Sequence, residues 1–252
     1  MKSLVIGMGQ VGQALYDVLS DIYEVTTRDI VPDRHSNGIE CIHICYPYTD
    51  DFVQVTADYI QEYSASLCII HSTVVPGTTG KIQKQTICDV AYSPIRGRHG
   101  QMQADLLRYI KFVGAPAMKS TSRALHYLRQ AGFRVGYLAN AKVLELAKLI
   151  ETTYSGLLIG WTQEMQRYCD TLDVDLADAL TLTDEVDYLP KYEFYPGYIG
   201  GHCIMPNLDL LKQVKPSDFA VAIQKSNEGR YRQAVEDDED LSVRHIPQSR
   251  VQ

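Results

Sequence analysis

The chain has 252 residues, of which 45% are hydrophobic, and a formal net charge of −7 at pH 7. This length and composition are typical of one large globular domain or two smaller ones. We expect neither a nucleic-acid nor a membrane partner, because phosphate binding needs clustered lysine and arginine and no apolar run approaches the length of a membrane span.

The beginning of the chain predicts a dinucleotide site. The short apolar run Ser3–Ile6 predicts a strand, a GxGxxG motif follows at once, and then an apolar helical pattern. In such a turn the first glycine bends the chain, the second lets a pyrophosphate approach the backbone, and the third lets helix and strand pack closely. The alternative is a domain of the same fold that binds no nucleotide. The motif residues predicted to line the cofactor are Gly7, Met8, Gly9, Gln10, Val11 and Gly12.

A carboxylate at the end of the second predicted strand selects the cofactor. Asp29 follows the run Tyr23–Arg28 and would bind the ribose hydroxyls of adenosine while repelling a 2′-phosphate. NAD is therefore favoured over NADP, and we expect the Arg28 side chain to be solvated. Tyr46 and Pro47 are predicted to complete the cofactor site.

Strands and helices alternate through the first half of the chain. Helices are predicted over Asp50–Tyr63 and Thr121–Gln130. This alternation predicts a Rossmann-like, doubly wound parallel sheet of an α/β fold, with helices on both faces. Further strands are predicted at Cys41–Cys45, Leu67–Ile70, Val90–Tyr92, Lys111–Val113 and Phe133–Tyr137.

The pattern changes at residue 140. Asn140 is a plausible N-cap, and a proline-free segment of thirty residues predicts one long helix of roughly 45 Å. Gly156 and Gly160 would let another helix come very near. We expect the apolar stripe to pack on a second domain or subunit, and predict a homodimer through residues 140–170. The stripe comprises Val143, Ala147, Ile150, Tyr154, Leu157, Trp161, Met165 and Tyr168.

The last part of the chain is mainly helical. Helices are predicted over Asp175–Leu182 and Ser217–Val235, with a loop at Leu189–Ile199 between them. The acidic run after residue 235 predicts a disordered tail. We therefore predict an NAD-binding Rossmann domain at 1–139, a helical dimerisation domain at 140–235, and a tail at 236–252.

Six cysteines form no CxxC pair and no zinc-ligand spacing, so no metal site is expected. No signal peptide precedes the first strand, and a reducing, cytoplasmic location follows as an expectation. Cys203 differs from the other cysteines because Gly200 and Gly201 come just before it and permit a sharp turn. A thiol on such a turn is a candidate nucleophile; the alternative is a buried structural thiol.

Five segments, in order and spacing, resemble the nucleotide-sugar 6-dehydrogenases, such as UDP-glucose and GDP-mannose dehydrogenase. The resemblance extends over residues 1–235, and the family continues for more than a further hundred residues into a second Rossmann-like domain. The segments are Gly7–Gly12, Tyr23–Ile30, Ser72–Thr79, Leu146–Leu149 and Pro196–Ile204.

The resemblance implies an NAD-dependent oxidation of a primary alcohol on a sugar-like substrate. By position, Cys203 would be the nucleophile, Lys148 would stabilise oxyanion character, and Thr73 would position water or cofactor. The alternatives are a solvated helix lysine for Lys148 and a turn-capping role for Thr73.

Two departures from the family pattern weaken a full oxidation to acid. Ile95 replaces the usual glutamate, and Asn207 replaces an aspartate that asparagine cannot mimic as a base, although Asp209 lies close by. Three hypotheses follow: a dehydrogenase with an altered substrate or an incomplete reaction; an impaired, NAD-binding regulatory protein; and a half-enzyme whose lid is a separate polypeptide.

Overall fold

The computed structural model describes residues 1–29, 38–97, 100–138, 140–187, 196–201 and 203–241. The chain divides into two compact units, residues 1–148 and 149–252. Most of the predicted loop at 189–199, His202, and the predicted tail from residue 242 onward lie outside the described residues. The domain limits at residues 139 and 235 stay a prediction.

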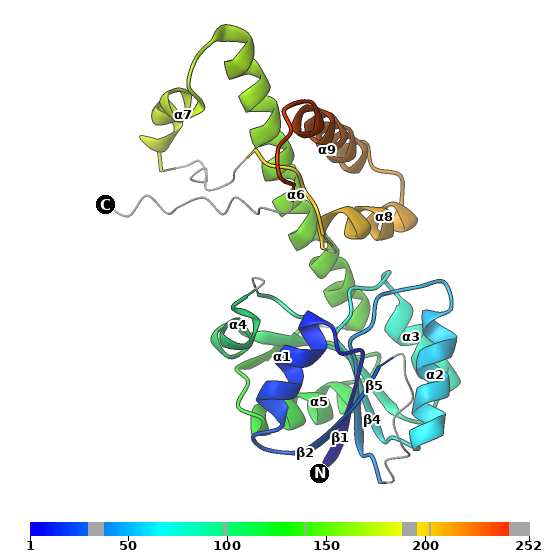
Figure 1. Cartoon of the computed structure of the whole chain (residues 1–252). Coiled ribbons are helices and arrows are strands. Elements are labelled where there is room, and N and C mark those ends of the chain that lie inside the picture. The colour runs from blue at the N-terminus through cyan, green and yellow to red at the C-terminus, as the bar shows by residue number, and fades with distance from the viewer. Residues whose placement is uncertain (30–37, 98–99, 139, 188–195, 202, 242–252) are drawn as a thin grey trace. The chain divides into compact units, whose positions relative to one another are not determined.

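A five-stranded parallel sheet forms the centre of the first unit, in the order β2-β1-β3-β4-β5 (Figure 1). Leu4 of β1 pairs with Thr26 of β2 on one side and with Ile42 of β3 on the other. The strand order therefore reverses beside β1, which is where doubly wound sheets bind their ligands. The predicted α/β fold class is confirmed. The strands are β1 Lys2–Ile6, β2 Glu24–Arg28, β3 Cys41–Ile44, β4 Leu67–Ile70 and β5 Asp89–Tyr92.

Two further predicted strands form a separate parallel pair, β6 Lys111–Val113 and β7 Val135–Tyr137. The link to the main sheet is a single antiparallel bridge between Tyr92 and Gly114, with N···O distances of 2.7 and 2.9 Å. The backbone thus reverses direction after β5 instead of adding a sixth parallel strand.

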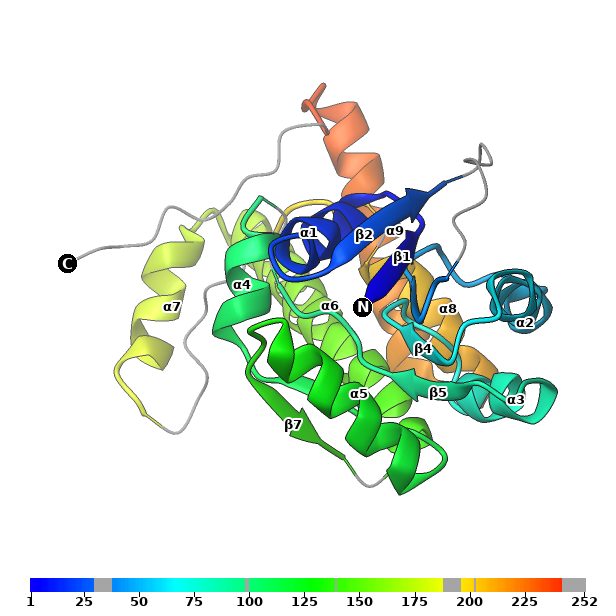
Figure 2. The same ribbon diagram turned by 90° about the horizontal axis from the view of Figure 1, so that it is seen from below.

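Side chains alternate between the two faces of the sheet and supply a core on each face. Residues of α1, α4 and α5 close one core, and residues of α2, α3 and the first turn of α6 close the other, as Figure 2 shows for α1 and α5 against α2 and α3. Strands β3 and β4 are buried throughout, as expected where helices cover both faces. The helices are α1 Gln10–Leu19, α2 Phe52–Tyr63, α3 Thr78–Gln85, α4 Met102–Arg108 and α5 Met118–Gln130.

A chain of buried polar groups crosses the first unit. The Ser93 carbonyl accepts from His71 Nδ1 (2.7 Å), so His71 Nε2 is left to accept from His43 Nδ1 (3.0 Å). His43 Nε2 then accepts from the Tyr127 hydroxyl (3.0 Å), which accepts from the Ser3 hydroxyl (2.8 Å). Each donor in the chain meets an acceptor, so both imidazoles are satisfied as neutral rings.

Lys111 lies at one end of this chain. Its ammonium donates to the Ser93 carbonyl (3.0 Å) and is buried. Burial lowers the pKa of Lys111 to about 7. Burial first, and then the charge of Lys111, lowers the pKa of His43 to about 3. Both shifts favour the uncharged side chain, because burial penalises the charged form.

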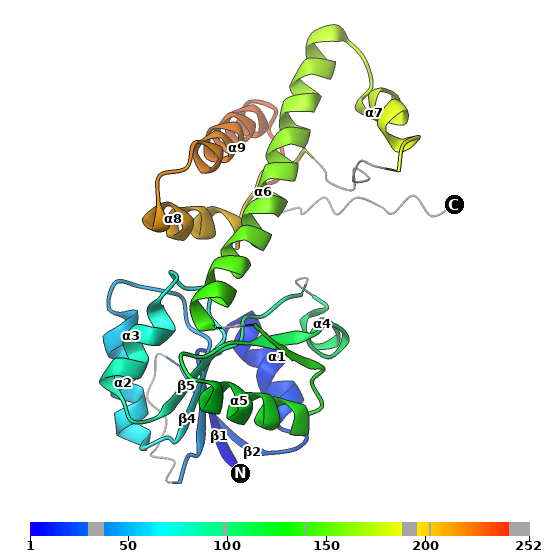
Figure 3. The same cartoon turned by 180° about the vertical axis from the view of Figure 1, so that it is seen from behind.

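One long helix, α6, begins in the first unit and continues in the second. It starts at an N-cap formed by Asn140, whose Oδ1 accepts from the Val143 N–H (3.0 Å), which confirms the predicted cap. A Cβ on Gly156 would lie 2.7 Å from Ile204 of α8, so the predicted close approach of another helix is confirmed. Figure 3 shows α8 and α9 along one side of α6. These helices are α6 Ala141–Leu172, α7 Leu176–Asp184, α8 Ile204–Val214 and α9 Asp218–Glu236.

The predicted apolar stripe of α6 is largely exposed. Its core-facing positions are instead occupied by small and polar residues such as Gly160 and Thr162. No described helix is long and apolar enough to cross a bilayer. The exposed stripe residues, with their exposed fractions, are Val143 47%, Ile150 55%, Tyr154 51%, Leu157 38%, Trp161 46% and Tyr168 57%.

Candidate functional site

The glycine turn lies at the point where the strand order reverses. Gly7 has a φ of 93°, and a Cβ there would lie 2.7 Å from the backbone nitrogen of Tyr46, at the end of β3. A Cβ on Gly12 would lie 1.9 Å from the Gly7 carbonyl oxygen. The protein itself thus requires these two glycines. A Cβ on Gly9, in contrast, would meet nothing within 4 Å.

Gly9 is also the N-cap of α1, so the open space beside it lies at a helix N-terminus. Free backbone N–H groups and the partial positive charge of the helix favour a phosphate at such a position. The turn therefore fits the predicted pyrophosphate. Gln10 is exposed at the start of α1, whereas Val11 packs against the core.

The side chains of Asp29 and Arg28 contact different parts of the first unit: Asp29 contacts the glycine turn and Arg28 contacts α2. Asp29 Oδ2 accepts from the Met8 N–H (3.3 Å), so this carboxylate lies beside the glycine turn. Arg28 was expected to be solvated, and this expectation is wrong. Its guanidinium donates to Glu62 (2.5 Å) and Tyr63 (2.6 Å) and lies 4.7 Å from the centre of the Tyr59 ring. The charge of Arg28 is thereby neutralised by α2, and three side chains hold the guanidinium in place. Arg28 is therefore not placed to bind the 2′-phosphate of NADP.

The loop after β4 carries Thr73 and is held at both ends. At its start the Ser72 hydroxyl donates to the Tyr46 carbonyl (2.6 Å), joining the loops that follow β3 and β4. In the described part of the chain the half-buried Thr73 hydroxyl makes no hydrogen bond, so it is open to a ligand. The hydroxyl groups of Tyr46 and Thr56 share a hydrogen bond (2.6 Å), and Pro47 is exposed.

Glu145 holds the far end of this loop. No sequence pattern had indicated this role. Its fully buried carboxylate accepts from the Thr79 N–H (2.8 Å), the Thr79 hydroxyl (2.6 Å) and the Gly77 N–H (2.5 Å). It thereby caps the N-terminus of α3 with a negative charge, where the helix dipole favours one. Glu145 lies one helical turn before Lys148, so the same turn of α6 carries the loop's anchor and the predicted lysine.

Lys148 is half-buried and is the last residue of the first unit. Its charge is one of the causes that lower the pKa of Lys111. Lys148 is therefore near the buried polar chain rather than on a fully solvated helix face. Its predicted role toward an oxyanion stays a prediction.

Cys203 is exposed and is the N-cap residue of α8. Gly201 has a φ of 88°, in the left-handed region that favours glycine, so the predicted sharp turn is present. The alternative of a buried thiol is wrong for this cysteine. Cys41, Cys68, Cys88 and Cys169 are buried, Cys45 is half-buried, and none of the six cysteines forms a disulfide.

Buried amide side chains hold the segment 196–201 that leads to Cys203. Asn227 Oδ1 accepts from the Ile199 N–H (2.7 Å), and its Nδ2 donates to the Ile199 carbonyl (3.1 Å). Gln163 Nε2 donates to the Gly197 carbonyl (2.8 Å), and Arg230 Nε donates to the Pro196 carbonyl (3.0 Å). Sequence reasoning missed Asn227 and Gln163, because a lone polar side chain on a helix gives no periodic signal.

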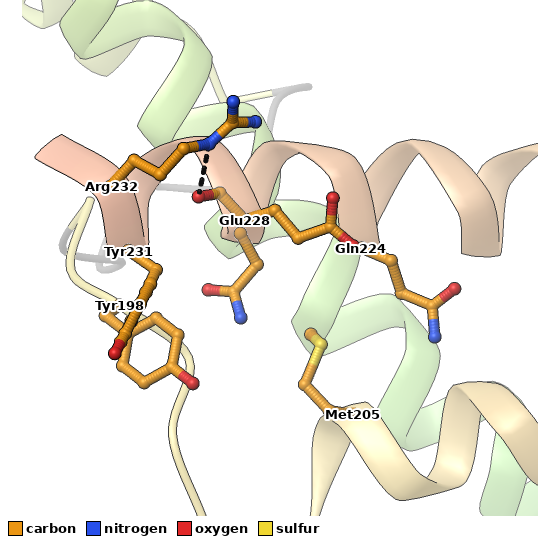
Figure 4. A pocket seen from close by; sticks show the side chains of 7 residues that line it. Tyr198, Met205, Gln224, Glu228, Tyr231 and Arg232 are labelled. Carbon is orange, nitrogen blue, oxygen red and sulfur yellow. Dashed lines mark hydrogen bonds between the residues drawn. The ribbon is translucent and has the colours of Figure 1, made fainter.

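A cavity of about 580 Å³ lies beside the same segment, between it and α9 (Figure 4). The ring centres of Tyr198 and Tyr231 lie 5.3 Å apart at one end of the cavity, and Met205 of α8 also lines the cavity. No group of three or more metal-ligating side chains occurs in the described ranges. The other lining residues are Gln224, Asn227, Glu228 and Arg232.

Residues 142–228 match the central domain of the UDP-glucose/GDP-mannose dehydrogenase family. The chain is therefore similar to that domain over these residues. The resemblance found in the sequence is thereby confirmed. The matched region contains Lys148, Cys203, Gln163 and Asn227, whereas the glycine turn and Asp29 precede it.

Two curated relatives, the UDP-N-acetyl-D-mannosamine dehydrogenases of Methanococcus vannielii and Methanococcus aeolicus, are each 30% identical to this chain. The first match covers 161 residues, 62% of this chain and 36% of the relative, and the second covers 200 residues, 75% and 43%. The chain therefore spans less than half the length of these relatives.

Solved structures of such enzymes share the fold. The UDP-D-ManNAc dehydrogenase of Pyrococcus horikoshii superposes with a TM-score of 0.77 at 21% identity, over 94% of this chain and 69% of that one. A UDP-glucose dehydrogenase from Pyrobaculum islandicum gives the same TM-score at 16% identity, over 93% and 69%.

The predicted residues fall into two groups. The first unit brings together the glycine turn, Asp29, Tyr46 and the loop of Thr73, all at the carboxyl ends of the strands. The second unit holds Cys203 and the amides that fix its turn.

Proposed function

We propose that this protein is an NAD-dependent dehydrogenase that oxidises a primary alcohol of a sugar-like, nucleotide-linked substrate through an adduct on Cys203. The observation that carries the proposal is the exposed Cys203 at the N-cap of α8, on a turn fixed by buried amides, within the family's central domain. The names of the curated relatives support a nucleotide sugar as the substrate class.

The first unit would hold NAD through backbone and carboxylate contacts. The turn Gly7–Gly12 and the start of α1 would bind the pyrophosphate, and Asp29 would bind the adenosine ribose. When bound, NAD supplies the hydride acceptor for the oxidation. Arg28 is neutralised by Glu62, which supports NAD over NADP.

The remaining chemistry would come from three side chains. The Cys203 thiolate would add to the aldehyde carbon and form a carbon–sulfur bond, and the resulting oxyanion would be stabilised by Lys148. A second oxidation would turn this adduct into a thioester, which water cleaves to acid and thiol. Thr73 would position that water or the cofactor.

The last step lacks the family's carboxylates. Ile95 is 7% exposed and belongs to the apolar core, and Asn207 is 6% exposed and cannot ionise. Asp209 pairs with Lys212 (2.9 Å) and accepts from Gln224 (3.0 Å), and these contacts lower its pKa. We therefore propose that thioester hydrolysis is slow.

The same observation favours one second candidate, a catalytically impaired regulatory protein that binds NAD. It shares the cofactor site and predicts tight NAD binding without turnover. We also propose a reducing, cytoplasmic location for either function, since none of the six cysteines forms a disulfide.

We propose that two copies associate through the exposed stripe of α6. Its large apolar side chains, among them Trp161 and Tyr154, follow one face of the helix. Contiguous exposed apolar surface of this kind marks an interface in soluble proteins.

The test is an NADH assay against a panel of UDP- and GDP-sugars, with the Cys203→Ala variant beside the wild type. In the wild type we expect a burst of NADH stoichiometric with enzyme and then a stall. The variant can carry out only the first oxidation, to the aldehyde, which needs no thiol, so we expect it to form no thioester and to lose the second NADH. NAD affinity is expected to be equal in both, since the thiol does not belong to the cofactor turn. Tight NAD binding with no NADH from any sugar nucleotide would favour the regulatory protein.

Lys148→Met tests the oxyanion role, with Lys142→Met as the matched control. Lys142 is an exposed lysine of the same helix. We expect the rate to fall about 100-fold or more in the first variant and to stay unchanged in the second. Equal rates for both variants would show that Lys148 does not stabilise an oxyanion and acts as an ordinary helix lysine.

A further inference from the structure

The segment 196–201 has no strand partner, so its backbone groups depend on side chains. Buried backbone N–H and C=O groups must be paired, because an unpaired one costs about 1–3 kcal/mol. Ile199 is 6% exposed and packs with Leu208, Ala220 and Ile223 in the small core of the second unit. Its N–H and carbonyl therefore have no access to water and need a partner from the protein.

Asn227 supplies both partners at once. Its amide, 5% exposed on α9, donates to and accepts from the same residue, as a neighbouring strand would. Gln163, 1% exposed on α6, adds a bond to Gly197 and lies 3.4 Å from Asn227 Oδ1. Two helices thereby fix one irregular stretch of backbone.

Cys203 lies four residues after Ile199, and the helix that it caps is held by the fully buried Leu208. Cys203 thus lies along the chain between two anchored residues, Ile199 and Leu208, and follows the left-handed Gly201. We propose that Asn227 is a positioning residue that, with Gln163, sets the place of the Cys203 thiol. The inference rests on the proposed function, in which this thiol is the nucleophile.

Asn227→Asp is the decisive variant, because it keeps the shape and replaces the donor with an acceptor. A carboxylate oxygen would then face the Ile199 carbonyl, and the two would repel each other. Protonation of the new carboxyl restores a donor, and burial raises the pKa of such a group toward the assay range. We expect the rate of the second oxidation in the burst, which forms the thioester, to fall about 10- to 100-fold at pH 8 and to recover as the pH is lowered, with KM for NAD unchanged.

Gln224→Glu is the matched control. It makes the same amide-to-carboxylate change one turn earlier on α9, in the lining of the same cavity (Figure 4). Gln224 bonds to Lys212 (2.9 Å) and Asp209 (3.0 Å) and not to the segment 196–201. We expect its pH profile to follow the wild type. Gln163→Glu makes the same change opposite the Gly197 carbonyl. It replaces Asn227→Asp in these measurements if Asn227→Asp does not fold.

A second measurement does not depend on turnover. Cys203 is the exposed thiol of the chain, so its alkylation by iodoacetamide can be followed by peptide mass spectrometry. We expect the alkylation rate of Asn227→Asp to differ from the wild type at pH 8 and to converge with it in acid, after correction for the same rate in Gln224→Glu.

The outcomes separate the two proposals. A wild type that forms no NADH contradicts the proposed function, while the alkylation profiles still report whether Asn227 controls the thiol. A wild-type pH profile in Asn227→Asp, in both assays, overturns the inference. So does a loss of the burst rate that follows the unfolded fraction and does not recover in acid.

Discussion

The two units bury their apolar surface in opposite ways. The first unit covers both faces of its sheet with its own helices, and strands β3 and β4 have no exposed residue. The second unit has one small core, formed by Ile199, Leu208, Ala220 and Ile223, and α7 buries no residue among those described. The first unit thus covers its apolar surface within the chain, whereas large apolar side chains of the second unit, such as Trp161, are exposed.

The largest expected loss of stability comes from a substitution at one glycine of the first unit, Gly12. Gly12→Ala places a Cβ 1.9 Å from the Gly7 carbonyl oxygen, so the backbone must move. We expect a loss of about 3 kcal/mol or more in the free energy of unfolding, and loss of NAD binding. Thermal unfolding and titration calorimetry with NAD measure both quantities.

Gly9→Ala is the control for this change, because its Cβ would point into open space. We expect the free energy of unfolding to stay within about 1 kcal/mol of the wild type, while NAD affinity falls. Equal stability losses in the two variants would contradict the distinction.

The second unit is tested at its exposed stripe. Trp161→Arg introduces a charge in the middle of the apolar face, and we expect a dimer to become a monomer in light scattering at micromolar concentration. Ile87→Lys is the control, since Ile87 is fully exposed in the first unit. A monomeric wild type, or dimers in both variants, would show that α6 is not the interface.

A further expected effect is a dependence of stability on pH. Folding lowers the pKa of His43 to about 3 and that of Lys111 to about 7, from about 6.5 and 10.4 in the unfolded chain. The unfolded state then holds more protons between these values, so the free energy of unfolding rises with pH from 3 to 6.5 and again from 7 to 10.4.

Lys111→Met is expected to remove the upper rise, by at most about 1.4 kcal/mol per pH unit. Urea unfolding between pH 6 and pH 10 measures the slope. Lys84→Met, at an exposed lysine of α3, is expected to keep the rise. An unchanged slope in Lys111→Met would mean that the buried ammonium is not its source.

The parts of the site that follow a strand could be predicted from the sequence. The turn Gly7–Gly12 and Asp29 stand at fixed offsets from short apolar runs, and Asn140 precedes a long proline-free helix. Such local signals depend on residues within one or two turns of each other. They also located the exposed Cys203 after its glycines.

Contacts between distant parts of the chain could not be predicted. Glu145 binds a loop 66 and 68 residues earlier, and Asn227 binds Ile199 across 28 residues. Neither side chain differs in type from many solvated ones. Arg28 was misjudged for the same reason, since its partners Glu62 and Tyr63 lie 34 and 35 residues away.

The row of hydrogen bonds through His43 and His71 gives the protein an internal spectroscopic reporter. Both imidazoles are buried with their Nδ1–H groups donating, so each ring proton is sheltered from exchange with solvent. These two protons are expected as slowly exchanging downfield signals in a proton NMR spectrum. Their loss would register disruption of the sheet interior directly, without any substrate, cofactor or added probe.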